Sequence, residues 1–116
     1  MIPSSTPPPP GPATSEAAWV PYVHRGYYDV PLHVVTIVDG VRYVLACAFD
    51  DARDAYDDRY QVSRGAAAPL DAPWEGLIDP ASLAPAGWLA VAALRFDHKR
   101  KRLDGAALVA GLTPAR

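Results

Sequence analysis

Cysteine, long apolar runs and an excess of charge of one sign are all scarce in this chain of 116 residues. The single cysteine excludes an internal disulfide framework and a cysteine-based zinc site. No apolar run approaches the length of about 18 residues that crosses a bilayer. The formal net charge of −2 gives no bulk attraction to nucleic acid or to anionic membranes. We therefore expect a small soluble protein of the cytoplasm, and the many Ala, Arg and Pro with few Lys indicate a bacterial source.

The motifs of common catalytic and cofactor sites are missing as well. None of the five serines lies in a G-x-S-x-G pattern, and no glycine-rich loop has the dinucleotide or P-loop spacing. His24, His33 and His98 lack the spacing of a metal site. We therefore expect no cofactor and no metal, and the sequence does not favour an enzyme.

The composition changes sharply near residue 17. Residues 1–16 contain six of the 13 prolines and few side chains that could pack. Because proline fixes φ and removes a backbone donor, this stretch is predicted to be a disordered tail with polyproline II character. The remaining residues, 17–116, are predicted to form one small domain with a modest core.

A β-hairpin is the clearest local pattern. Two apolar runs, 32–38 and 41–49, flank Asp39-Gly40, a pair suited to the left-handed dihedrals of a type I′ turn. This turn places Val38 opposite Val41 and gives the hairpin one apolar face. The other face also carries apolar residues at its middle, namely Val35, Ile37 and Val44. A solvent face alternates more strictly, so we expect either the rest of the chain or a second copy to cover this patch.

The other predicted elements are short. Residues 22–30 are expected to be extended, 60–64 to form an edge strand and 88–96 to form a strand, although helix stays open for the last. Helices are predicted where an Asp can cap a first turn, over 50–60, 79–84 and 104–110, and 65–76 is predicted to be a loop. Two or three short helices with a small antiparallel sheet built on the hairpin define an α+β fold.

An acidic cluster lies directly after the hairpin. Residues 50–60 contain five Asp against two Arg, which gives a local net charge of −3. One interpretation is a docking patch for a basic partner with tyrosine anchors. The alternative is a solvated helix face, because Phe49, Ala52, Tyr56 and Tyr60 follow a helical stripe.

A basic run near the C-terminus has the opposite charge. Arg95 and residues 99–102 supply five of the 11 basic side chains. Such a run could bind nucleic acid as an accessory protein does, but stacking of bases requires exposed aromatic rings nearby. Only Phe96 is close in sequence, and strand parity places it on the inner face.

Asp97-His98-Lys99 resembles half of a metal-dependent nuclease motif. In that motif the carboxylates hold Mg²⁺ and the lysine orients water. The second carboxylate is not identified in the sequence, so a small hydrolase that uses Asp97 and Lys99 is kept only as an alternative.

Trp74 lies in the predicted loop and is either a lid over the core or an exposed anchor. Taken together, the sequence favours a non-enzymatic interaction or accessory module that binds a protein partner and forms a homodimer. The predicted self-association residues are Val35, Ile37 and Val44. The predicted partner-binding residues are Asp54, Tyr56, Asp57, Asp58, Trp74, Lys99, Arg100, Lys101 and Arg102.

Overall fold

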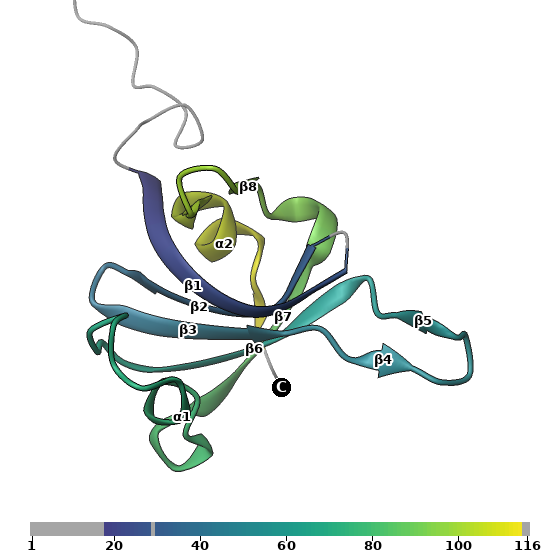
Figure 1. Cartoon of the computed structure of the whole chain (residues 1–116), viewed down its shortest axis with the longest axis horizontal. Coiled ribbons are helices and arrows are strands. Elements are labelled where there is room, and N and C mark those ends of the chain that lie inside the picture. Colours follow the sequence, from purple (N-terminus) through teal and green to yellow (C-terminus); the bar gives the residue numbers. More distant parts are fainter. Residues whose placement is uncertain (1–17, 29, 115–116) are drawn as a thin grey trace, which may run out of the picture.

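A curled antiparallel sheet of eight strands dominates the computed structural model, which describes residues 18–28 and 30–114 (Figure 1). The predicted tail, residues 1–16, lies outside the described residues. The strand order is β10-β7-β6-β3-β2-β1-β9-β8, and β4 and β5 form a separate two-stranded sheet. The elements are β1 (Trp19–Tyr28), β2 (Val30–Val38), β3 (Val41–Ala46), β4 (Phe49–Asp50), β5 (Ala55–Tyr56), β6 (Arg59–Ala66), α1 (Trp74–Leu77), β7 (Ala84–Ala90), β8 (Phe96–Asp97), β9 (Arg102–Asp104), α2 (Gly105–Gly111) and β10 (Thr113–Pro114).

The prediction of an α+β fold with two or three helices is wrong, because the described chain is mainly β. It holds two helices, of four and seven residues, together with 3₁₀ turns at Pro80–Ser82 and Val91–Ala93. The helix expected over 50–60 is replaced by the β4–β5 hairpin. The Asp50 side chain accepts hydrogen bonds from the backbone N–H groups of Ala52 and Arg53, at 3.0 and 3.4 Å, and closes a turn instead of capping a helix.

The central hairpin has the predicted register. Val38 pairs with Val41, and Val34 pairs with Leu45. Asp39 and Gly40 have φ values of 51° and 78°, as a type I′ turn requires. The turn chemistry of two residues therefore fixes the alignment of β2 and β3.

Two further strand predictions need correction. Residues 60–64 belong to β6, which lies between β3 and β7 and is not an edge strand. Exposed Arg59 and Gln61 alternate with buried Tyr60 and Val62, which shows one solvent-facing side and not an open edge. The strand expected over 88–96 is instead β7, which ends at Ala90.

The C-terminal helix follows its prediction closely. The Asp104 carboxylate accepts a hydrogen bond from the Ala107 N–H at 3.0 Å and caps α2. Leu103 before the cap and Leu108 in the first turns are both fully buried. The cap and this apolar pair hold α2 against the sheet.

The apolar patch of the second sheet face is covered by the chain itself. Val35 and Val44 are buried under residues 67–83, which we call the covering segment and which includes α1. Leu77 from α1 is 1% exposed and completes this outer cluster, whereas Ile37 is half-buried. Of the two alternatives predicted for the patch, the structure supports coverage by the rest of the chain.

The inner face of the curled sheet forms the larger core. Tyr60 lies fully buried in it and donates a hydrogen bond from its hydroxyl group to the Pro31 carbonyl oxygen at 2.7 Å. The other buried members come from the sheet, from α2 and from two connecting segments: Tyr22, Val34, Val38, Tyr43, Leu45, Cys47, Val62, Ala86, Leu89, Leu94, Leu103 and Leu108.

Tyr60 gives a test of this core through pH. Burial raises the pKa of its hydroxyl above the ordinary value, and the nearby Cys47, Tyr22 and Tyr27 groups raise it further. Above about pH 10 an unfolded tyrosine ionises while Tyr60 stays protonated in the folded state, so stability falls as the pH rises. Tyr60→Phe should lower the free energy of unfolding by about 1–3 kcal/mol at pH 7, because the Pro31 oxygen loses its donor. Urea unfolding at neutral and alkaline pH should also show a weaker alkaline loss in the variant; an identical pH dependence would contradict the assignment.

Candidate functional site

The β4–β5 hairpin extends away from the curled sheet, as Figure 1 shows at the right of the view. We call residues 49–58 the acidic hairpin. Its two strands are held by the pairs Phe49 with Tyr56 and Asp50 with Ala55. Asp54 closes the turn with a positive φ of 53°, a conformation that Asp tolerates better than most residues. The segment is therefore an ordered projection with its own hydrogen bonds.

The acidic hairpin carries more negative charge than its ion pairs neutralise. Arg53 lies 3.9 Å from Asp50, and Arg59 just beyond the hairpin lies 4.0 Å from Asp58. All four of these side chains are at least 38% exposed, so the pairs contribute little. The predicted partner-binding residues Asp54, Asp57 and Asp58 all lie on this projection.

Phe49 is presented at the base of the acidic hairpin. Its side chain is 47% exposed and packs edge-on against Tyr56, with ring centroids 5.1 Å apart. Tyr56 is half-buried and contacts the main core, so it supports the exposed ring. Strand parity predicts an inward-facing Phe49, and Cys47 does lie in the core, but β3 ends at Ala46 and the alternation is lost between Cys47 and Phe49.

Cys47 connects the acidic hairpin to the core. It is a buried free thiol that donates a hydrogen bond to the Asp57 carbonyl oxygen at 3.1 Å. Burial raises the pKa of the thiol, and the Asp57 and Asp58 carboxylates raise it further. The thiol therefore acts as a small core side chain, which is its predicted role.

Trp74 lies in α1 and closes the outer cluster. It is half-buried, and the guanidinium of Arg25 lies over its ring at 5.1 Å from the centroid. Of the two predicted positions, lid or exposed anchor, the structure places it as a lid over Val35 and Val44. It does not lie on the acidic hairpin.

The basic run forms the turn that joins β8 to β9, and we call residues 98–102 the basic turn. Lys99, Arg100, Lys101 and Arg102 are all exposed. The Asp97 carboxylate accepts the Arg100 backbone N–H at 3.1 Å and lies 3.8 Å from its guanidinium. Beside the turn, a hollow of about 210 Å³ is lined by Trp19, Asp97, Arg100 and Arg102.

The Asp97 geometry does not support the hydrolase alternative. Its carboxylate holds the turn, and its neighbours in the hollow are a tryptophan and two arginines. Among the described residues, no group of three or more His, Cys, Asp or Glu side chains is placed to hold a metal ion. Lys99 belongs to the same turn, but the hollow offers Asp97 no second carboxylate from the part of the chain that the structure describes.

Aromatic rings lie beside the basic turn, contrary to the prediction that only Phe96 would be close. Phe96 is half-buried and stacks with His98 at a centroid distance of 5.5 Å. Tyr27 from β1 is 56% exposed and meets the His98 ring edge-on at 5.7 Å. Sequence reasoning missed Tyr27 and His98 because the strand that brings them together is paired through β9, far along the chain.

Comparisons with protein-family models, with curated proteins and with solved structures gave no match. Within the described ranges, the helices are all too short or too polar to cross a membrane. The two charged surfaces, the acidic hairpin and the basic turn, are therefore the features that bear on function.

Proposed function

We propose that this chain is a non-enzymatic, cytoplasmic accessory module whose acidic hairpin docks on a basic surface of a partner protein. The observation that carries the proposal is the exposed Phe49 ring, which packs against Tyr56 on a projecting hairpin that also carries five Asp residues. Exposed aromatic rings are the side chains that most often dominate binding energy at protein interfaces. The sequence-based assignment of Asp54, Tyr56, Asp57 and Asp58 to partner binding belongs to the same surface.

The charges and the ring have different roles in this proposal. Exposed carboxylates attract a basic partner and speed its encounter, an effect that weakens as salt rises. A ring that becomes buried contributes mainly to the lifetime of the complex. Phe49 is therefore the anchor, and the Asp side chains select partners of positive charge.

The partner is proposed to be a different protein. The patch that suggested a homodimer is covered within the chain, since Val35 and Val44 lie under the covering segment. A head-to-tail contact between the acidic hairpin of one copy and the basic turn of another would use two different surfaces, and such contacts close only for special rotations. Light scattering at high micromolar concentration should accordingly give the monomer mass.

A peptide-display selection tests the docking surface. Peptides selected on the wild-type chain should be rich in Lys and Arg, and Phe49→Ala should weaken their binding about tenfold or more. The double variant Asp51→Asn and Asp54→Asn should weaken binding at low salt and reduce its salt dependence. Asn suits the positive φ of Asp54, so this turn should survive the change.

The matched control removes charge elsewhere. Asp71 and Glu75 are exposed in the covering segment, and the double variant Asp71→Asn and Glu75→Gln should bind the selected peptides as the wild type does. Equal weakening by the control and the hairpin variants would mean that only net charge matters. That result, or selected peptides without basic residues, would contradict the proposed docking surface.

A further inference from the structure

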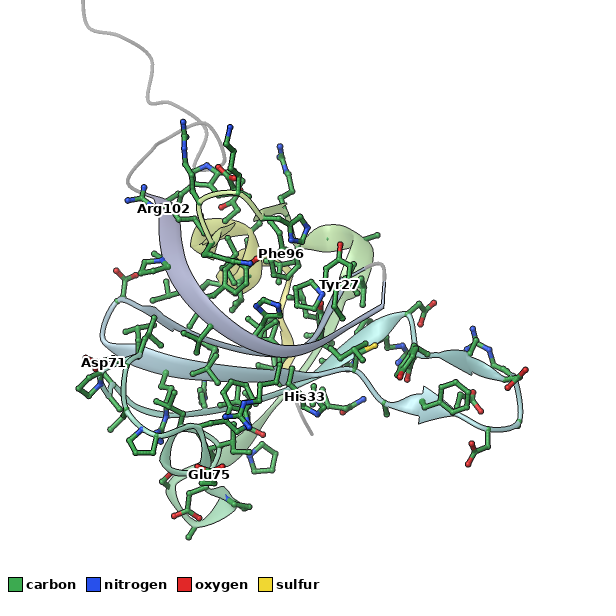
Figure 2. All side chains as sticks on the ribbon, in the orientation of Figure 1. Tyr27, His33, Asp71, Glu75, Phe96 and Arg102 are labelled. Atoms are coloured by element: carbon green, nitrogen blue, oxygen red, sulfur yellow. The ribbon has the colours of Figure 1, made fainter. Side chains whose placement is uncertain are left out.

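The basic turn and the rings beside it form a second surface, distinct from the acidic hairpin. Four cationic side chains of the basic turn are exposed, and two of them, those of Arg100 and Arg102, line the hollow together with Asp97. In Figure 2, Arg102, Phe96 and Tyr27 are spread along β1, whereas the labelled acidic residues Asp71 and Glu75 lie on the opposite side of the sheet in this view. The local charge is therefore positive although the chain is acidic overall.

The rings are ordered by contacts with one another. His98 stacks on Phe96 with an interplanar angle of 20° and lies 3.5 Å from the Tyr22 hydroxyl through Nδ1. Tyr22 is buried and packs edge-on against Phe96 at 5.3 Å. The buried Tyr22 and the half-buried Phe96 thus form a base that supports the exposed rings of His98 and Tyr27.

The position of His24 joins these rings to the cations. Its ring lies 5.8 Å from Tyr22, and its pKa is lowered by burial, by Lys101 and by His98. The Tyr22 backbone N–H donates a hydrogen bond to the Lys101 carbonyl oxygen at 3.1 Å, which places the basic turn beside the ring cluster. The rings and the cations are therefore neighbours, and Trp19 lines the hollow together with Arg100 and Arg102.

We propose that this surface binds single-stranded nucleic acid. An unpaired base has an open face that can stack on the exposed Tyr27 ring, which meets His98 edge-on, while Lys99, Arg100 and Arg102 contact the adjoining phosphates. Alternating aromatic and cationic contacts of this kind are how single strands are held without base-specific hydrogen bonds. A duplex keeps its base faces covered, and four cations on an acidic chain offer too few phosphate contacts to hold it by charge alone.

The inference goes beyond the proposed function, since it uses other residues and another class of ligand. Failure of peptide docking at the acidic hairpin would not contradict the proposed binding of single strands. Failure of single-strand binding would likewise not contradict peptide docking. Together the two surfaces would let the module bring a protein partner to a single strand.

Fluorescence anisotropy with labelled oligothymidine and oligouridine of about 12 nucleotides tests the site. The wild type should bind both single strands more tightly than a duplex of the same length. Tyr27→Ala should weaken binding by about 5- to 100-fold, whereas Tyr27→Phe, which keeps the ring, should remain within about twofold. Tyr27 is largely exposed, so thermal melting should be unchanged in both variants.

Salt titration separates the phosphate contacts from the stacking. The double variant Lys99→Gln and Arg100→Gln should reduce the slope of log affinity against log salt by about 0.7 for each phosphate that these cations neutralise in the wild type. The matched variant Arg53→Gln and Arg64→Gln removes the same charge from exposed positions elsewhere and should leave the slope unchanged. No binding at low salt, equal binding of duplex, or full affinity in Tyr27→Ala would each overturn the proposal. So would binding to phosphatidylserine vesicles in place of the oligonucleotides.

Discussion

Replacement of Gly65 by alanine is expected to destabilise the fold by about 2–4 kcal/mol, the largest effect of a single added methyl group here. A Cβ atom at this position in β6 would clash with the Ser82 carbonyl oxygen, which belongs to the backbone and cannot rotate away. It would also lie 2.9 Å from the Arg42 guanidinium and 3.2 Å from the Leu83 side chain. The added methyl therefore pushes the covering segment off the sheet.

Gly76→Ala is the matched control for this effect. Gly76 lies in α1 of the same segment, and a Cβ atom there would meet nothing within 4 Å. Urea unfolding should show Gly76→Ala within about 0.5 kcal/mol of the wild type, because Ala suits a helix better than Gly. Equal stabilities for the two variants would contradict the close contact between β6 and the covering segment.

Arg42→Ala is expected to cost about 2–4 kcal/mol and to release the covering segment. Arg42 is 5% exposed, and its guanidinium donates to the Gly76 carbonyl oxygen at 3.4 Å and to the Ser82 carbonyl and hydroxyl oxygens at 3.3 and 2.9 Å. These bonds fasten α1 and the following 3₁₀ turn to β3. Without them the outer cluster around Val35 and Val44 loses its cover.

Two further substitutions test whether the forked guanidinium itself, and not only its positive charge or its volume, holds the covering segment. Arg42→Lys keeps the charge, but one ammonium cannot reach both Gly76 and Ser82, so it should recover little of the loss. Arg42→Met keeps the aliphatic part of the side chain and should recover only the stability that comes from its packing. Hydrogen exchange of the amides of residues 67–83 should accelerate in all three variants; unchanged protection in Arg42→Met would contradict the fastening role.

The central hairpin could be predicted from the sequence because its information is local. Asp39-Gly40 sets the turn, and the register of β2 and β3 follows from it residue by residue. The cap at Asp104 is equally local, and its prediction is confirmed. Such features need no knowledge of the rest of the chain.

The helix expected over 50–60 shows how a local pattern can mislead. Phe49 and Tyr56 are spaced as on a helix, but the same spacing suits a short hairpin in which they become cross-strand partners. Asp50 can cap a helix or close a turn, and tertiary attachment through Cys47 and Asp57 favours the turn. The spacing of apolar residues over 50–60 therefore could not decide between a helix and a hairpin.

The ligand-binding surfaces depend on contacts between distant segments, so only parts of them could be predicted from the sequence. The charge clusters are visible in the residue order, but the exposure of Phe49 depends on where β3 ends. Tyr27 meets His98 only because β1 pairs with β9 and carries the basic turn beside it. Arg42 lies at the polar end of the second hairpin face, and it is buried because the covering segment packs on that face.

The most direct measurement is a titration of the wild type, Phe49→Ala and Tyr27→Ala with both the selected basic peptide and the labelled oligothymidine. Phe49→Ala should lose affinity for the peptide alone, and Tyr27→Ala should lose affinity for the single strand alone. This result would establish two separate binding surfaces on one small sheet. Loss of the same ligand in both variants, or of neither ligand in either, would contradict the account.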